Sequence, residues 1–149
     1  MEKEKTTLQG KFHIAVVREG QIVEERSSYN TVTAAGKALV SGLILTDIGG
    51  TACDNIAIGT GTTAPATGQT ALVGELYRNA CTGSQQTTTV TNDTARLTCS
   101  VAITATATMS EAGVFNATSS GTMLARATYS AIGVNNGDTL NIGYDIVIA

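Results

Sequence analysis

The longest alternation of apolar and polar residues in the chain is 94–108, TARLTCSVAITATAT. Every second residue from Ala95 to Ala107 is apolar, and the residues between them are Thr, Arg or Ser except at Ala102. This period of two is that of a β-strand with one face in a core and the other in water or against a polar partner. We expect one long strand here, which bends or crosses a whole sheet because most strands have about five or six residues.

Shorter alternations indicate that most of the chain is β-structure. Residues 10–30 predict a hairpin that turns at Glu19 and Gly20 and returns along an exposed edge strand. Further strands are expected at 55–59, within 82–93 and from Met123 to about Ile132, separated by turn residues at intervals of roughly ten residues. Asn-Gly at 136–137 favours a tight hairpin turn before the final strand.

One segment, 31–50, has the pattern of a helix. Thr33 is a good N-cap, Leu39 and Leu43 share a side at four-residue spacing, and Gly49-Gly50 ends the region. A single short helix of this kind is expected to plug one end of a sandwich.

Length and composition fit these patterns. The chain has 149 residues with 16 Gly and one Pro, and it is rich in Thr, which suits a pleated, half-exposed surface. We predict a mainly β protein, an antiparallel β-sandwich of jelly-roll type with one short helix. Residues 10–149 are expected to form a single domain, and residues 1–9 an arm that is flexible or bound to a partner.

Charge and targeting signals exclude several classes of partner. The net charge is −3 and the pI about 5.0, so the chain lacks the basic surface that nucleic acid requires. The first residues, MEKEKTTLQG, lack the apolar core of a signal peptide, and no apolar run has transmembrane length. We expect a soluble protein, not exported by that route, with no nucleic-acid or membrane partner.

The stretch 56–72, IAIGTGTTAPATGQTAL, contains the Gly-x-Gly-x-x-Ala spelling of a dinucleotide-binding turn. That turn requires a helix after it and an acidic residue about twenty positions later. Pro65 follows directly, no helical periodicity comes next, and 79–84 holds no carboxylate. We therefore expect no nucleotide and no other cofactor, and interpret the stretch as a Gly/Thr-rich connection between two strands.

No set of residues predicts a catalytic or metal site. His13 is the only histidine, and it falls on the polar face of a predicted strand. Glu111 and Asp145 are an alternative pair of carboxylates for a glycan hydrolase, although solvation at a turn or sheet edge is the ordinary role of such residues. Asp47 and Asp54 flank a Gly-rich turn and are an alternative for loose calcium binding, without the spacing of a known calcium loop.

The three cysteines share no metal-ligand spacing. Cys99 is expected to be a buried, reduced thiol on the apolar face of its strand. Spacing does not determine whether Cys53 and Cys81 pair, and a reducing cytoplasm disfavours that bridge.

The polar face of 94–108 suggests a role in assembly. A row of Thr hydroxyls suits a surface that packs against a copy of the chain or a neighbouring subunit, since cross-strand hydroxyls pair with each other or with trapped water. A solvated outer sheet face is the alternative.

Several segments together resemble small structural proteins of tailed bacteriophages. The resemblance covers about residues 28–149, and it implies a non-enzymatic β-sandwich component of the virion that works by assembly. Proteins of this kind include capsid decoration (cement) proteins and tail- or fibre-associated proteins. The segments that carry it, in order, are 30–39 (NTVTAAGKAL), 56–65 (IAIGTGTTAP), 70–78 (TALVGELYR), 110–117 (SEAGVFNA), 121–129 (GTMLARATY) and 138–146 (DTLNIGYDI).

The resemblance leads us to expect a capsid decoration protein that forms a trimer and clamps neighbouring major capsid subunits on the virion, assembled in the host cytoplasm. The alternative is a tail-tip, fibre or baseplate module that binds the host surface, with Tyr29, Tyr77 and Tyr129 available for a glycan. The expected contact residues lie in the charged arm and on the Thr face, and they are Glu2, Lys3, Lys5, Lys11, Thr98, Thr104 and Thr106.

Overall fold

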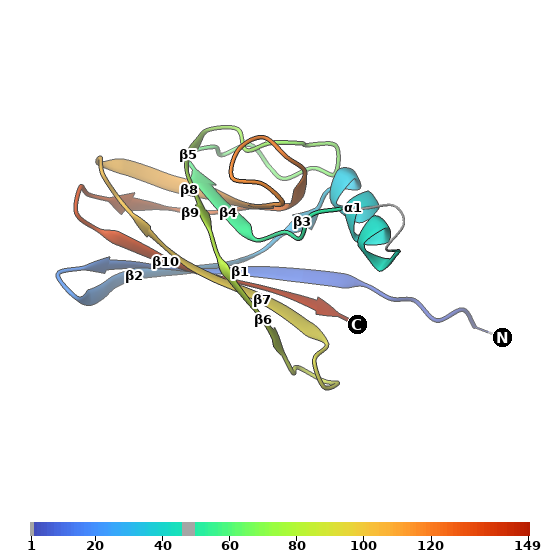
Figure 1. Ribbon diagram of the computed structural model, residues 1–149. Coiled ribbons are helices and arrows are strands. Elements are labelled where there is room, and N and C mark those ends of the chain that lie inside the picture. Colours follow the sequence, from blue (N-terminus) through green and yellow to red (C-terminus); the bar gives the residue numbers. More distant parts are fainter. Residues whose placement is uncertain (1, 46–49) are drawn as a thin grey trace.

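The computed structural model describes residues 2–45 and 50–149. Two antiparallel sheets pack face to face, and one helix lies at the end where both termini are found (Figure 1). The predicted mainly β, antiparallel sandwich with one short helix is confirmed.

Each sheet has five strands, and the chain passes between the sheets four times, as in jelly-roll-like sandwiches. In order across the sheet, sheet A consists of β2 (Gln21–Tyr29), β1 (Leu8–Arg18), β10 (Thr139–Ile148), β7 (Thr94–Ala102) and β6 (Thr82–Gln86). Sheet B consists of β3 (Thr31–Val32), β9 (Met123–Val134), β8 (Ala107–Phe115), β4 (Asn55–Gly59) and β5 (Glu75–Ala80).

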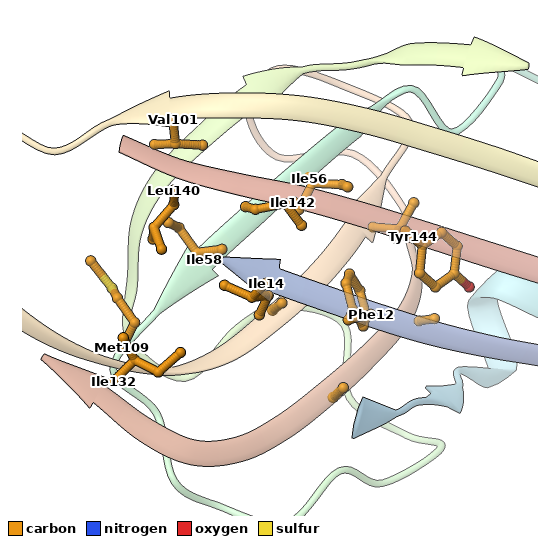
Figure 2. Close-up of a cluster of buried hydrophobic side chains, with 14 of the residues drawn as sticks. Phe12, Ile14, Ile56, Ile58, Val101, Met109, Ile132, Leu140, Ile142 and Tyr144 are labelled. Atoms are coloured by element: carbon orange, nitrogen blue, oxygen red, sulfur yellow. The ribbon is translucent and has the colours of Figure 1, made fainter. Parts of the chain in front are cut away.

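The main core lies between the two sheets and is built from the inward positions of the alternating strands (Figure 2). Phe12 and Tyr144 stack obliquely in it, with ring centroids 4.7 Å apart. Phe12, Ile14 and Val16 point inward from β1 while Lys11 and His13 point out, as the alternation predicts. Aliphatic side chains from both sheets fill the rest, which compensates for the scarcity of aromatic residues.

The hairpin turns form where the sequence places them. Glu19 and Gly20 both have positive φ (51° and 77°) between β1 and β2. Gly137, with φ 93°, turns the chain between β9 and β10, and Asp138 N donates to Asn135 O at 3.0 Å. β2 is an edge strand of sheet A, as its charged residues indicated.

The prediction of one strand over 94–108 is wrong, because this stretch is divided between the two sheets. β7 ends at Ala102, and β8 begins at Ala107 in the other sheet. The connection 103–106 stays close to the alternating pattern: Ile103 remains buried while Thr104 and Thr106 are exposed. A period of two continues through this extended crossing, so alternation alone does not reveal the break.

Helix α1 (Ala34–Ile44) begins as predicted, with Thr33 Oγ1 accepting a hydrogen bond from Gly36 N at 2.8 Å. The predicted packing face is only partly right: Leu39 is half-buried but Leu43 is exposed, and the fully buried helix residues are Gly36 and Gly42. A side chain at Gly36 would collide with the backbone of Leu124, so glycine lets the helix approach β9 closely.

The helix ends at Ile44, earlier than predicted, and Gly49 lies outside the described residues. Within 2–45 and 50–149, no helix is both long and apolar enough to cross a bilayer.

The N-terminal arm is shorter than predicted. β1 begins at Leu8, and Thr7 and Ala149 exchange backbone hydrogen bonds beyond it (2.5 and 3.0 Å). Residues 2–6 are exposed and continue past the end of the sandwich (Figure 1).

The two long sides of the sandwich close differently. On one side, Arg26 and Ser28 of β2 reach across to β9, where they donate to the carbonyls of Ser130 and Thr128 at 3.1 and 2.8 Å. On the other side the chain itself passes from β5 to β6, and Asn79 Nδ2 donates to Ser100 O at 3.0 Å.

Candidate functional site

The Gly-rich segment 60–74 is a long loop that covers the outer side of sheet B. Leu72 packs there against Ala57, Phe115 and Met123, which form a second small apolar cluster. Since Ala112 and Val114 of β8 face the main core, the alternate residue Glu111 points to the loop side.

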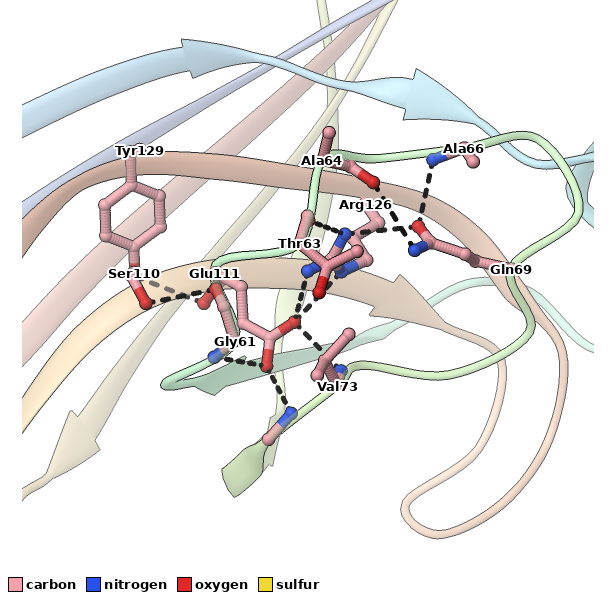
Figure 3. Close-up of polar contacts among 11 residues, drawn as sticks. Gly61, Thr63, Ala64, Ala66, Gln69, Val73, Ser110, Glu111, Arg126 and Tyr129 are labelled. Carbon is pink, nitrogen blue, oxygen red and sulfur yellow. Dashed lines mark hydrogen bonds and ion pairs between the residues drawn. The ribbon is translucent and has the colours of Figure 1, made fainter.

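The Glu111 carboxylate binds three backbone amides of this loop (Figure 3). Its Oε1 accepts from Gly61 N at 2.9 Å and from Gly74 N at 2.6 Å, and its Oε2 accepts from Val73 N at 3.0 Å. A Cβ atom at Gly61 would lie 2.6 Å from the carboxylate, so glycine is required for this approach.

Arg126 completes the cluster from the neighbouring strand β9. Its Nε and Nη2 lie 2.9 and 2.8 Å from Glu111 Oε2, and both side chains have no solvent exposure. Its Nη1 donates to Thr63 O at 2.7 Å and to Gln69 Oε1 at 3.1 Å. The guanidinium therefore holds the middle of the loop, while the carboxylate holds its two ends.

Opposing effects determine the protonation of Glu111. Burial raises the pKa of this carboxyl, but the amides of Gly74, Val73 and Gly61 and the Arg126 guanidinium together lower it below its ordinary value. Glu111 is therefore charged at neutral pH. Burial, and next the charge of Glu111, raise the pKa of Tyr129, whose hydroxyl donates to Glu111 O at 3.2 Å.

This geometry explains the resemblance of 56–72 to a nucleotide-binding turn. Loop amides do converge on an anion, as in phosphate-binding loops, but the anion is the chain's own carboxylate. Sequence reasoning missed the Glu111–Arg126 pair, because the two charged residues stand among apolar neighbours fifteen positions apart. A signal was available: each of these two strands carries one charged residue among apolar ones, and the chain also has a Gly-rich loop whose amides could bind a carboxylate.

Glu111 and Asp145 do not share a site. Glu111 lies under the loop on the outer side of sheet B, whereas Asp145 alternates with the buried Tyr144 and Ile146 and so points outward from sheet A. Asp145 pairs with Arg96, with nitrogen–oxygen distances of 2.7 and 2.6 Å. The core of the sandwich separates the two carboxylates, so the arrangement needed for paired-carboxylate hydrolysis is not formed.

The outer face of sheet A carries polar residues from all five of its strands. Cross-strand register aligns Ser27, His13, Gly143, Thr98 and Thr82 in one row across five strands. A neighbouring row consists of Tyr29, Lys11, Asp145, Arg96 and Ser84.

Two adjacent hollows, of about 600 and 450 Å³, open on this face and share His13, Thr98 and Gly143. The missing side chain at Gly143 leaves their common floor open. The fixed charges that line them balance, with Lys11 and Arg96 against Glu25 and Asp145. We call this neutral, hydroxyl-rich, concave surface the sheet A face.

The structure brings together only some of the predicted contact residues. Lys11 and Thr98 line the same hollow of the sheet A face. Thr104 and Thr106 lie apart from them on the connection 103–106, where Thr104 Oγ1 is 3.3 Å from Tyr77 Oη. The remaining three, Glu2, Lys3 and Lys5, are exposed on the arm.

The remaining candidate residues in the described part of the chain, His13, the three cysteines and Asp54, form no shared site. His13 is half-exposed, 3.0 Å from Ser27 Oγ and 3.6 Å from Glu25. Cys53, Cys81 and Cys99 are free thiols. Asp47 lies outside the described residues, and Asp54 accepts a hydrogen bond from Asn55 at 2.5 Å. In the described part of the chain, no three His, Cys, Asp or Glu residues cluster as metal ligands.

Comparisons of the chain with protein-family models, with curated proteins and with solved structures found no match.

Proposed function

We propose that this protein is a structural component of a tailed-phage virion, a capsid decoration protein that forms trimers and binds between major capsid subunits. The observation that carries the proposal is the sheet A face, a neutral polar surface spanning five strands. The likeness of the ordered segments between 28 and 149 to small phage structural proteins supports it. Binding to the mature shell in preference to looser states would stabilise the shell by mass action.

A cyclic trimer requires two different, complementary patches on each subunit, because its interfaces are heterologous. The chain offers a concave patch, the sheet A face around Thr98, and a separate exposed one, the connection 103–106 with Thr104 and Thr106 exposed. We assign these patches to each other across the interface between neighbouring copies. Thr98 and the pair Thr104 and Thr106 lie apart within one chain because each would contact the other patch on a neighbouring copy.

The exposed arm, residues 2–6, is the second contact surface. It carries Glu2, Lys3, Glu4 and Lys5 beyond the end of the sandwich. An exposed charged arm of this kind suits docking on a neighbouring capsid subunit, where opposite charges select the register.

A second candidate function is host-surface binding by a tail-tip, fibre or baseplate module. Tyr29 favours it: this ring is 71% exposed on the row of Lys11, next to the hollows, and the Lys11 ammonium lies 5.3 Å from its centroid. An exposed ring beside a polar hollow can stack on a sugar. Tyr77 and Tyr129 are less suitable, since both are engaged in hydrogen bonds within the fold.

Cryo-electron microscopy of virions whose genome encodes this chain tests the two candidates. Decoration predicts density for the sandwich in a symmetric array on the shell, with the 103–106 connection of one copy against the sheet A face of the next. Density confined to the tail would replace decoration with the host-binding function. Absence of the chain from purified virions would overturn both.

A further inference from the structure

Cys81 and Cys99 face each other across the edge of sheet A. Thr82 of β6 pairs with Thr98 of β7, and extending this antiparallel register by one residue sets Cys81 opposite Cys99. Cys81 itself stands where the chain leaves sheet B, since its backbone N–H donates to Asp54 O at 2.7 Å. Directly opposed residues in such a ladder have Cα atoms about 4.5–5.5 Å apart, within the range of about 4.4–6.8 Å found in disulfides.

The two thiols also point the same way. Cys99 pairs with the buried Ile142 of β10, and Cys81 and Cys99 both pack, partly buried, against the main core. A hydrogen bond between the thiols lowers the pKa of Cys81, and the same contact together with burial raises the pKa of Cys99.

Cys53 has different surroundings. Burial and the neighbouring Asp54 raise the pKa of its thiol to about 11. It borders an apolar hollow with Tyr144 and Leu97 near α1, and not the β6–β7 edge. Of the three cysteines, Cys81 is therefore the one whose thiolate forms most readily beside a second thiol.

We propose that Cys81 and Cys99 form a disulfide when the protein meets a small-molecule disulfide such as oxidised glutathione. The Cys81 thiolate attacks one sulfur of that molecule and releases a thiolate, leaving a mixed disulfide on Cys81. The Cys99 sulfur, on losing its proton, then attacks the Cys81 sulfur and releases the second thiolate. Two protein thiols are oxidised, one small disulfide is reduced to two thiols, and the two protons pass to those products.

The bond would lock the place where the chain passes from sheet B to sheet A. The five-residue strand β6 lies at the edge of sheet A and pairs with β7. Cys81 is the one residue between the end of β5 and the start of β6. A covalent link between 81 and 99 restricts the unfolded chain and keeps this edge in register.

Peptide mapping tests the proposal on the full chain. The protein is equilibrated with excess oxidised glutathione, remaining thiols are alkylated, and the product is digested with trypsin. Cleavage after Arg78, Arg96 and Arg126 puts Cys81 in 79–96 and Cys99 in 97–126, while Cys53 stays in 38–78. We expect the first two peptides to be joined, and alkylated groups to fall from three per chain to one, on Cys53.

Matched variants and a stability readout distinguish this bond from others. Cys53→Ser should retain the cross-link, whereas Cys81→Ser and Cys99→Ser should each lose it. Oxidation should raise the Tm of the wild type by about 5–10 °C and leave that of Cys99→Ser unchanged. A cross-link to 38–78, or alkylation of all three cysteines after oxidation, would overturn the proposal.

Discussion

Glu111 and Arg126 form an ion pair with no solvent exposure in a protein whose other strong pairs are partly exposed. Removing two charges from water is costly, and the attraction between them compensates only when their remaining hydrogen-bonding groups find partners. Here those partners are loop backbone groups and the Gln69 side chain, so the pair ties a loop to a sheet. Its role is structural, and its energetic importance can be measured.

Replacing Glu111 with Gln should destabilise the fold strongly. The substitution keeps the side-chain shape but leaves Arg126 charged and unpaired in the interior, which costs about 3–5 kcal/mol. Urea denaturation measures the loss. Asp145→Asn is the matched control, because the Arg96–Asp145 pair is partly exposed and such pairs contribute about 0–1 kcal/mol. Equal losses in the two variants would contradict a special role for the buried pair.

Acid should weaken the fold through the same carboxylate. The folded-state pKa of Glu111 lies below the unfolded value of 4.5, so its contribution is complete above pH 4.5 and is lost as the pH falls through the folded pKa. Asp138, bound by Arg18, and Asp93, bound by the amides of Val90, Thr88 and Thr89, act in the same direction because their pKa values are also lowered.

The free energy of unfolding, measured by urea denaturation between pH 6 and 3, should therefore fall toward acid. The decrease should be smaller in Glu111→Gln, with a residual slope from Asp138 and Asp93. An identical slope in both proteins would show that Glu111 does not titrate with folding.

At the scale of elements, the two sheets present different outer faces. Sheet B is covered by the loop 60–74, whereas sheet A is left with hydroxyls, balanced charges and a hollow above Gly143. The outer face of sheet A is therefore uncovered, as the proposed assembly requires. Gly143 permits a direct test, because a Cβ added there meets no atom within 4 Å.

Gly143→Trp should fill the hollow without disturbing the strand, and should dissociate the proposed trimer. Gly133→Trp is the control: Gly133 lies in β9 of sheet B, and a Cβ there also meets nothing within 4 Å. Light scattering should give the mass of one chain for the first variant and of three chains for the second. A trimer of the Gly143 variant would exclude the sheet A face from the interface.

At the scale of the whole molecule, both termini and α1 lie at one end of the sandwich (Figure 1). The connection 103–106 lies by the β9–β10 turn, where Ile103 and Asp138 share a backbone hydrogen bond of 2.9 Å. The molecule thus combines an arm, a concave face and an exposed connection. Each surface can be altered separately.

A charge exchange tests the pairing of patches between copies. Thr98→Lys should reduce the mass measured by light scattering to that of one chain, because it puts a charge into the interface. Adding Thr106→Glu should restore association by supplying the opposite charge from the neighbouring copy. Failure of the double variant to associate, with its fold intact by circular dichroism, would refute the contact between these patches.

Deleting residues 2–6 should leave the fold intact and weaken attachment to the capsid. The shorter deletion follows from the structure, since Thr7 pairs with Ala149 and Leu8 begins β1. The expected result is an unchanged Tm with lower occupancy on virions, measured by cryo-electron microscopy. Full occupancy would assign capsid attachment to another surface.

Sequence reasoning was most successful where structure depends on near neighbours. Alternation located β1 and β10, and a short apolar run located β4. The turns at Glu19-Gly20 and Asn136-Gly137 were identified from residue type, and Thr33 was recognised as a cap. Each depends on steric preferences or hydrogen bonds within a few residues. The sandwich class followed from the number and spacing of these elements.

The sequence by itself determined several strands, the hairpin turns, the start of the helix and the class of fold, because those follow from local backbone geometry and a period of two. Only the tertiary structure decided that 94–108 divides between two sheets, that Gly36 and not Leu43 packs the helix, and that Glu111 holds the loop 60–74. Those outcomes depend on contacts between distant segments. An extended crossing has the same alternation as a strand, and a carboxylate's partners are set by which loop folds over it.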